Sequence, residues 1–362
     1  MPAQTLPQLL LLTAFVTATV SVGAELTPPP LPMPTSNNAV VTVTDNAGRA
    51  YLVSFAGLGS GKTYRDTHAR TFVLATDAAS WREAPPLPGG VGRLAATAVA
   101  LGSRAYVFGG YAVGSDGSER STPWVHAFDP LTATFESAQA MPVPVDDAVA
   151  VAYQDRFAYL ISGWHDDGNV NLVQRYDRNT DSWQQATPVP GRAVFGHAGG
   201  IVGNTIVYCD GVAVRVHHAR RRDFVANSAC YTGKIDPDNP RRIDWRRIDD
   251  HPGRPRYRMA AVGARALGAV VFVGGSNNPY NYDGIGYDGE PAEPSADHFY
   301  YDLRTNRWQM LASDAPATMD HRALAPWAGT WVTVGGMLAD QRVTDQVVVH
   351  TLLPPPAHPP NR

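Results

Sequence analysis

The chain has 362 residues, 44% of them hydrophobic, and its 30 Lys and Arg against 33 Asp and Glu give a formal charge of −3. This near-neutral balance excludes a nucleic-acid-binding protein that works by phosphate neutralisation, and we expect no nucleic-acid partner. The 8 Trp, 15 Tyr and 11 Phe exclude a disordered chain, because they supply ample apolar area for a core. The 33 Gly and 30 Pro are typical of many short strands joined by turns.

The first 24 residues carry no charged side chain and contain an apolar run from Leu9 to Val22, followed by Gly23 and Ala24. A run of this length is too short to cross a hydrocarbon core of ~30 Å as a helix. We therefore predict a signal peptide over residues 1–24, cleaved near Ala24, and a periplasmic or secreted mature protein. No later segment has the character of a membrane span.

An internal repeat recurs at intervals of roughly 48 to 65 residues. Each unit has an apolar, β-rich run that ends in a pair of small residues, and an aromatic-Asp pair follows, with a large aromatic residue six positions after the Asp in the clearest units. The small pairs are Ala56-Gly57, Gly109-Gly110, Ser162-Gly163, Asp210-Gly211, Gly274-Gly275 and Gly335-Gly336. The clearest downstream copies are Phe128-Asp129 with Phe135, Tyr176-Asp177 with Trp183, and Tyr301-Asp302 with Trp308.

This repeated pattern predicts four short strands per unit, which form one antiparallel sheet. The small pair marks a close backbone approach or positive φ after strand two, and the Asp begins a tight turn after strand three. We expect Trp81, Trp183, Trp245 and Trp308 to be mostly buried at equivalent places on strand four. One such sheet cannot bury both of its faces, so six sheets must stack radially, as in an all-β six-bladed propeller.

The order of small pair, aromatic-Asp and Trp resembles the kelch repeat over roughly residues 36 to 352. The resemblance implies a kelch-type propeller of four-stranded antiparallel blades, as one domain over residues 25–353 with a Pro-rich tail at 354–362. The sixth unit lacks a fourth strand, and the segment from Leu26 to Pro34 reads like the strand-four endings of the other units. We therefore expect the N-terminal segment to close the ring. The predicted blades are 37–89, 90–144, 145–191, 192–253, 254–317 and 318–352 plus 26–35.

The two cysteines lie at the end of one apolar run, Cys209, and near the start of the next expected strand, Cys230. If these strands are antiparallel neighbours, the two thiols face each other and can form a disulfide, as an exported protein permits. Two buried free thiols are the alternative.

Because the four strands of a blade alternate in direction, the loop after strand two and the link into the next blade lie on the same face of the propeller. The longest loops after a small pair are in units four and five, and the second has the Asn, Tyr and Asp side chains that suit sugar recognition. Among the links, Arg93, Asp146 and Arg258 share one spacing from the following small pair, so we expect them to surround the same central mouth. We predict that the loop and the links together hold a small sugar or glycan of anionic character, through Arg93, Asp147, His197, Tyr257, Arg258, Asn278, Tyr280, Tyr282, Asp288, His321 and Arg322.

Metal and cofactor chemistry is not indicated. His217 and His218 are adjacent in the sequence, and neighbouring residues on a strand point to opposite faces. We predict no metal and no other cofactor.

The signal peptide, the six units, the N-terminal closure and the final Val334-Gly335-Gly336 run resemble the exported N-acetylneuraminate epimerase family, the sialic acid mutarotases. That resemblance implies a carbohydrate isomerase with a catalytic Glu, followed by an Arg, just after the small pair of unit four. Val212 stands where the Glu is expected, so Asp210 is the candidate carboxylate and Arg215 the candidate Arg. The alternative is a non-catalytic propeller that binds a glycan or a protein partner.

Overall fold

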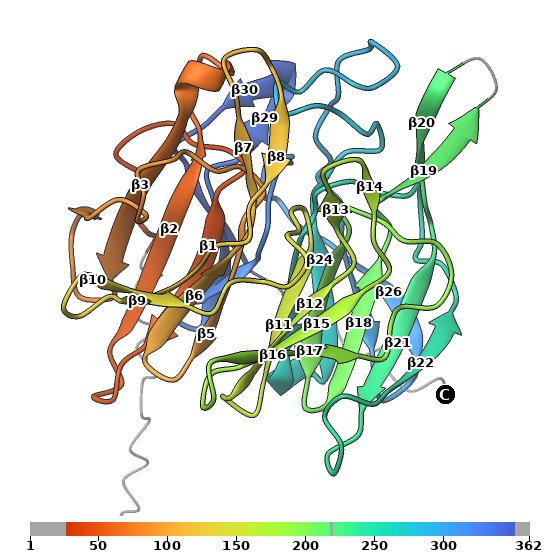
Figure 1. Ribbon diagram of the computed structural model, residues 1–362, viewed down its shortest axis with the longest axis horizontal. Coiled ribbons are helices and arrows are strands. Elements are labelled where there is room, and N and C mark those ends of the chain that lie inside the picture. The colour runs from red at the N-terminus through yellow and green to blue at the C-terminus, as the bar shows by residue number, and fades with distance from the viewer. Residues whose placement is uncertain (1–26, 218–219, 352–362) are drawn as a thin grey trace, which may run out of the picture.

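Six antiparallel sheets surround a common axis in the computed structural model, which describes residues 27–217 and 220–351 (Figure 1). The predicted all-β six-bladed propeller is confirmed. Helix within these residues is limited to three 3-10 turns, η1 (Tyr64–Asp66), η2 (Arg265–Leu267) and η3 (Ala339–Gln341). In that part of the chain no helix has the length and apolar character that a membrane crossing requires.

Five blades have four strands and the sixth has three in the described residues. Blade one contains β1 (Ala39–Thr44), β2 (Ala50–Leu58), β3 (Thr67–Ala75) and β4 (Arg82–Ala84). Blade two contains β5 (Thr97–Leu101), β6 (Arg104–Phe108), β9 (Val125–Asp129) and β10 (Thr134–Ala138). Blade three contains β11 (Val149–Tyr153), β12 (Phe157–Ile161), β15 (Val173–Asp177) and β16 (Ser182–Ala186).

Blade four contains β17 (Ala198–Val202), β18 (Thr205–Cys209), β21 (Cys230–Ile235) and β22 (Ile243–Ile248). Blade five contains β23 (Ala260–Ala264), β24 (Ala269–Val273), β25 (His298–Asp302) and β26 (Arg307–Leu311). Blade six contains β27 (Ala325–Trp327), β28 (Thr330–Val334) and β31 (Val347–His350).

Four blades carry an extra hairpin between their second and third strands. These are β7 (Tyr111–Val113) with β8 (Glu119–Ser121), β13 (Trp164–His165) with β14 (Gly168–Asn169), β19 (Val212–His217) with β20 (Arg220–Ala226), and β29 (Met337–Leu338) with β30 (Arg342–Val343). In Figure 1 the hairpins β7–β8, β19–β20 and β29–β30 extend from the upper end of the molecule. The loop after β24 of blade five has the corresponding place in its own blade.

The small pairs adopt the backbone conformation that the sequence predicts. Both residues of all six pairs have positive φ; in blade two, Gly109 has φ 55° and Gly110 has φ 82°. A Cβ atom on Gly110 would lie 2.7 Å from the carbonyl oxygen of Leu94, which belongs to the link that enters the same blade. The second residue of the pair is therefore Gly because the backbone of the link passes directly over it.

A ring of backbone hydrogen bonds joins the blades around the axis. One residue of each link has left-handed φ, between 49° and 69°, and its carbonyl accepts an N–H from the next link around the ring. The donor is the next link's equivalent residue at five of the six steps, and His321, just after that residue, at the sixth. We call these six residues the central ring: Asn37, Ala95, Asp147, Gly196, Arg258 and Asp320. Left-handed φ is unfavourable for residues with a Cβ atom, so the hydrogen bonds of the ring offset a local strain.

Tryptophans connect neighbouring blades at their outer edges. The indole Nε1 of Trp183 donates to Gln139 O at 2.8 Å, and that of Trp308 donates to Asp249 O at 2.8 Å. Each acceptor is the first residue after strand four of the preceding blade. Trp183 and Trp308 are on strand four and half-buried, as is Trp245, whereas Trp81 is buried and precedes β4. The prediction of mostly buried tryptophans is therefore confirmed, although an indole that spans two blade edges keeps part of its ring open to solvent and Trp81 lies one residue before its strand four.

The N-terminal segment connects blade six to blade one. Leu31 N donates to Asp345 O at 2.7 Å, as Met141 N donates to Pro123 O in blade two, and Trp81 Nε1 donates to Pro29 O. Residues 29–31 therefore take the place that follows strand four in the other blades. The described part of the predicted closing strand, residues 27–35, is not itself a strand. The expected signal peptide and the Pro-rich tail lie outside the described residues.

Cys209 on β18 and Cys230 on β21 are directly opposed in the antiparallel register and form a disulfide, with their Cα atoms 4.2 Å apart. Of the two alternatives for these thiols, the structure shows the bridge.

Candidate functional site

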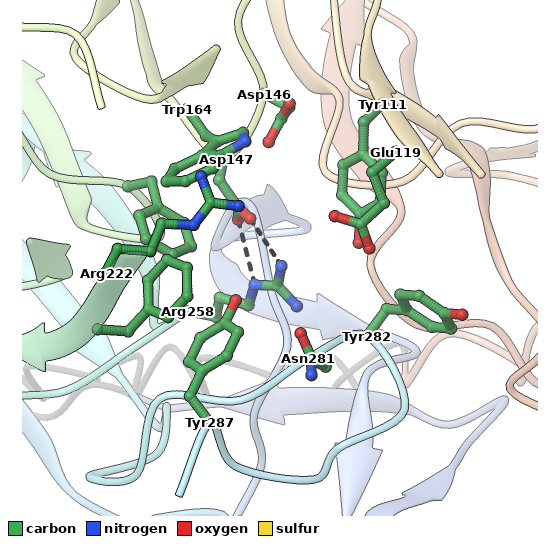
Figure 2. Close-up of a pocket in the computed structure, with 12 residues that line it drawn as sticks. Tyr111, Glu119, Asp146, Asp147, Trp164, Arg222, Arg258, Asn281, Tyr282 and Tyr287 are labelled. Atoms are coloured by element: carbon green, nitrogen blue, oxygen red, sulfur yellow. Dashed lines mark hydrogen bonds and ion pairs between the residues drawn. The ribbon is translucent and has the colours of Figure 1, made fainter. Parts of the chain in front are cut away.

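A cavity of about 310 Å³ opens at the mouth of the central channel, among the extra hairpins (Figure 2). Hairpins β7–β8 and β19–β20, the strand β13 and the loop after β24 supply its walls, and the central ring supplies its floor. The lining residues are Tyr111, Glu119, Asp146, Asp147, Trp164, Phe195, Arg222, Phe224, Arg258, Asn281, Tyr282 and Tyr287.

The floor is a network of two arginines and two aspartates. Arg258 binds Asp147 through Nη2–Oδ2 at 2.6 Å and Nε–Oδ1 at 3.2 Å, and its Nη1 donates to Asp320 Oδ1 at 3.0 Å. Arg322 Nη2 lies 2.7 Å from the other side of Asp147, at Oδ1. All four side chains are buried, so each charge is compensated within the protein rather than by water.

This network fixes the charge of Asp147. Burial acts to raise the pKa of Asp147, but the guanidinium groups of Arg258 and Arg322 outweigh it and the pKa is lowered. Burial acts to lower the pKa of Arg258, and Asp147 raises it well above its ordinary value. Asp147 and Arg258 therefore form a stable ion pair, and Arg258 has only part of its donor capacity left for a ligand.

Asp146 is adjacent to Asp147 in the sequence, but its pKa is shifted in the opposite direction. Burial, and then the negative charge of Asp147, raise the pKa of Asp146 well above its ordinary value. The hydroxyl of Ser121 donates to Asp146 Oδ2 at 2.6 Å and itself accepts from Asp166 N at 3.1 Å, which fixes the orientation of the carboxyl. The cavity thus holds two adjacent carboxyls whose pKa values are shifted in opposite directions.

One wall is aromatic and cationic. Phe224 on β20 stacks on Tyr287 of the blade-five loop, with ring centroids 4.1 Å apart. The guanidinium of Arg222 lies 4.9 Å from the ring centroid of Trp164, and its Nη1 donates to Asp167 O at 2.8 Å. Figure 2 shows Trp164, Arg222 and Tyr287 together on one side of the cavity.

The opposite wall is formed by Tyr111, Glu119 and Tyr282, which Figure 2 shows across the cavity from Arg222. Burial raises the pKa of Glu119, against the lowering effect of Arg258, and Asp147 raises it further. Among the described residues, no side chain forms an ion pair or hydrogen bond with the Glu119 carboxylate.

Three of the predicted binding residues line the cavity: Asp147, Arg258 and Tyr282. Two more lie directly behind it, since Tyr280 packs at 5.0 Å from Tyr257 and its hydroxyl donates to Asp320 at 3.4 Å. Arg322 belongs to the floor network through Asp147 but does not itself line the cavity.

His197 and His321 line a smaller cavity of about 50 Å³ in the channel, away from the mouth. Burial lowers the pKa of His197 to about 4 and that of His321 to about 3, so both imidazoles are neutral at physiological pH.

Asn278 and Asp288 bind each other within the blade-five loop, where Asn278 Nδ2 donates to Asp288 Oδ1 at 3.1 Å, and neither residue lines the cavity. Arg93 is also away from the cavity, buried, with Nη1 donating to Gly109 O at 2.9 Å. The shared spacing of Arg93, Asp146 and Arg258 did not make them equivalent, because the ring residue of blade two is Ala95 and the turns between strands one and two differ in length.

The structure does not bring the two catalytic candidates, Asp210 and Arg215, together. Asp210 is buried between blades four and five, and its Oδ2 accepts from His251 Nε2 at 2.7 Å and from Arg256 N at 2.7 Å. Arg215 is on β19, exposed, with Nη2 3.3 Å from Asp223. Asp210 therefore anchors the link that leads to Arg258, and neither residue lines the mouth cavity.

Sequence reasoning missed Tyr111, Glu119, Trp164, Phe195 and Phe224 as site residues. A signal was present for two of them, since Tyr111 and Trp164 directly follow a small pair. The backbone of that position bridges to the incoming link, as Tyr111 does with Leu94, so its side chain lies at the mouth.

Among the residues that the structure describes, no group of three or more His, Cys, Asp or Glu side chains is placed to hold a metal ion.

Comparisons with known proteins agree with this architecture. Residues 92–142 match the family model of the Kelch motif. Kelch-like protein 36 of Bos taurus is 22% identical over 270 residues, which are 74% of this chain but only 39% of that protein. The solved structure of YjhT aligns with a TM-score of 0.70 over 90% of this chain and 99% of that chain, at 17% identity. This structural likeness establishes the fold.

Proposed function

For a six-bladed β-propeller that contains a Kelch motif, we propose that the mouth cavity binds a small acidic sugar and that Asp146 acts as a general acid and base in the interconversion of its anomers. The observation that carries this proposal is the pair of adjacent carboxyls whose pKa values are shifted in opposite directions. Two carboxyls in one cavity with separated pKa values are the arrangement by which proteins assign acid and base roles.

Sugar binding is supported by the walls. The cavity of about 310 Å³ lies at the lower end of the range for small-molecule sites, which suits a single sugar ring. Trp164, Phe224 and Tyr282 offer flat faces for the C–H groups of such a ring, and Asn281 offers an amide for its hydroxyls. Arg222 offers a cation at the wall for a sugar carboxylate.

The proposed chemistry uses the protonated form of Asp146, which its raised pKa favours. As the bond between the anomeric carbon and the ring oxygen breaks, the Asp146 proton passes to the ring oxygen and water accepts the proton of the anomeric hydroxyl. In the open-chain form the carbonyl group then rotates about the bond to its neighbouring carbon, so that its other face meets the ring oxygen. Ring closure returns the ring-oxygen proton to the Asp146 carboxylate, while water supplies a proton to the former carbonyl oxygen. Ser121 keeps the carboxyl directed during both steps.

The resemblance to the sialic acid mutarotase family supports the reaction class, but the acid/base group is placed differently. Asp210 anchors a link between blades, so we propose Asp146 in its stead. The arginine that meets the sugar is Arg222, because Arg258 is occupied by Asp147 and Asp320.

The test is anomer exchange followed by NMR in freshly dissolved galacturonic acid and in the corresponding neutral sugar. We expect the wild-type protein to accelerate exchange, and Asp146→Asn to abolish this while changing the affinity by less than about twofold. Asp244→Asn, at an exposed ion pair with Arg246, is the matched control and should change neither quantity. Binding without accelerated exchange for every sugar would leave a non-catalytic propeller for a glycan or a protein partner.

We also propose that the protein is exported. The disulfide between Cys209 and Cys230 supports this, because such bridges persist in oxidising compartments. A fusion of residues 1–24 to a reporter protein, assayed in periplasmic and cytoplasmic fractions, tests it.

A further inference from the structure

The mouth cavity has two poles of opposite charge. Arg222 and Arg258 carry the cations, on one wall and on the floor, and Glu119 carries a carboxylate on the opposite wall. The sides are not interchangeable, since the Phe224 ring lies 5.6 Å from the Arg222 guanidinium, whereas Figure 2 shows Tyr111 and Tyr282 on the side of Glu119.

The Glu119 pole has the composition of an ammonium site. Tyr111, Glu119 and Tyr282 line the cavity together, and Figure 2 shows all three on the side opposite Arg222. Tyrosine faces beside a carboxylate attract an organic cation through the ring quadrupole and the full negative charge. Glu119 is exposed, and within the described chain no Arg, Lys or His pairs with its carboxylate, so the carboxylate is available to a cationic group of a ligand.

The opposite pole has the composition of a carboxylate site. Arg222 is held in place by the carbonyl of Asp167, by the exposed carboxylate of the same residue at 3.9 Å and by the ring of Trp164, and its guanidinium lines the cavity. A planar guanidinium that is already oriented binds a carboxylate at little further cost in side-chain entropy.

We infer that the ligand of this cavity is a zwitterionic amino sugar acid, whose ammonium group binds at Glu119, between Tyr111 and Tyr282, and whose carboxylate binds at Arg222. This inference rests on the proposed function and narrows its substrate class. A sugar with a carboxylate alone makes no ion pair with the exposed Glu119, and an acylated amine cannot make one either. The zwitterion neutralises both poles.

The experiment is calorimetric titration at pH 7 with four probes: 2-amino-2-deoxygalacturonic acid, galacturonic acid, galactosamine and galactose. 2-Amino-2-deoxygalacturonic acid should bind at least about tenfold more tightly than galacturonic acid, a difference in binding free energy of about 1.4 kcal/mol. Glu119→Gln should abolish that preference and leave the affinity for galacturonic acid within about twofold. Glu136→Gln is the matched control, because Glu136 lies in the same blade, on β10, exposed, and pairs with Arg104.

Each outcome decides the inference. If the protein and Glu119→Gln bind galacturonic acid and its amino derivative equally, the zwitterion assignment is overturned and the acidic-sugar site stands. If galactosamine binds as tightly as 2-amino-2-deoxygalacturonic acid, the carboxylate site at Arg222 is refuted. We expect instead that Arg222→Met loses binding of 2-amino-2-deoxygalacturonic acid. If no acidic sugar binds at all, the proposed function and this inference both fail.

Discussion

Replacement of Arg258 by Met removes the central cation of the charged floor at nearly constant volume. The Arg258 side chain is 3% exposed and binds Asp147 twice and Asp320 once. After the change, Arg322 alone faces both carboxylates, at 2.7 Å from Asp147 and 3.9 Å from Asp320. One buried carboxylate is then left without a full counter-charge, and we expect the free energy of unfolding to fall by about 3–5 kcal/mol.

The assay is urea unfolding at pH 7, with Arg304→Met as control. Arg304 pairs with Asp302, but its side chain is 75% exposed, so its loss should change the free energy of unfolding by at most about 0.5 kcal/mol. The double variant Arg258→Met, Asp147→Asn should recover part of the loss, since it removes the orphaned charge too. A loss in Arg258→Met no larger than that in Arg304→Met would refute the reasoning.

The pH dependence of this variant has a definite sign. The folded-state pKa of Asp147 is lowered from its ordinary value of 3.8, so the ionised carboxylate stabilises the fold above that pH and the contribution is lost as the pH falls through the folded pKa. Without Arg258 the lowering is weaker. The stability gap between wild type and variant should therefore narrow below about pH 4, as measured by unfolding at a series of pH values.

Three further predictions concern other parts of the fold. The pKa of Asp146 is raised in the fold, so the unfolded chain releases this proton at a lower pH than the folded protein does and stability falls as the pH rises above 3.8; Asp146→Asn should therefore gain stability relative to wild type between acid and neutral pH in the same titration. Gly110→Ala should lower the free energy of unfolding by more than about 2 kcal/mol, since its Cβ would lie 2.7 Å from a carbonyl oxygen. Gly117 has a similar positive φ, but no atom lies within 4 Å of a Cβ there, so Gly117→Ala should cost about 1 kcal/mol. Reduction of the Cys209–Cys230 bridge, or its replacement by two serines, should lower the free energy of unfolding by roughly 3 kcal/mol, and equal melting temperatures with and without reductant would contradict this.

The fold was predictable from the sequence because each element of the repeat has a local physical cause. The small pairs need positive φ, and Asp129 accepts the N–H of Leu131 to begin its turn. Alternating buried and half-buried residues on β11 show the period of two that a sheet requires. These causes act within a few residues, and their recurrence fixes the number of blades.

The site was predictable only as far as topology determines it. Strand parity placed Asp147 and Arg258 at the mouth correctly. Linear spacing could not identify equivalent residues, because η2 lengthens the turn between the first two strands of blade five. Glu119 escaped notice for a related reason: it lies on a hairpin inserted between strands two and three, where nothing in the repeat sets its position.

Asp210 shows the limit of analogy between side chains. It occupies the first place of a small pair with φ 67°, where other blades have Gly, Ala or Ser. Its carboxylate turns back toward His251 and the link that follows, away from the mouth. A carboxyl near the expected position in sequence was thus directed into the structure by its backbone conformation.

The central ring separates geometry from chemistry. Its hydrogen bonds use only main-chain atoms, so an approximately sixfold template persists while the six side chains differ freely in charge. Blades three, five and six contribute ionic groups to the ring, and the other three contribute an amide, a methyl group and a hydrogen. The charge around the channel axis is therefore unevenly distributed. Exchange of a side chain at such a position alters the potential over the channel without moving the scaffold. Gly196 is the exception, because a Cβ there would clash with the ring of Tyr257, so five positions of the ring carry a side chain and one is sterically closed.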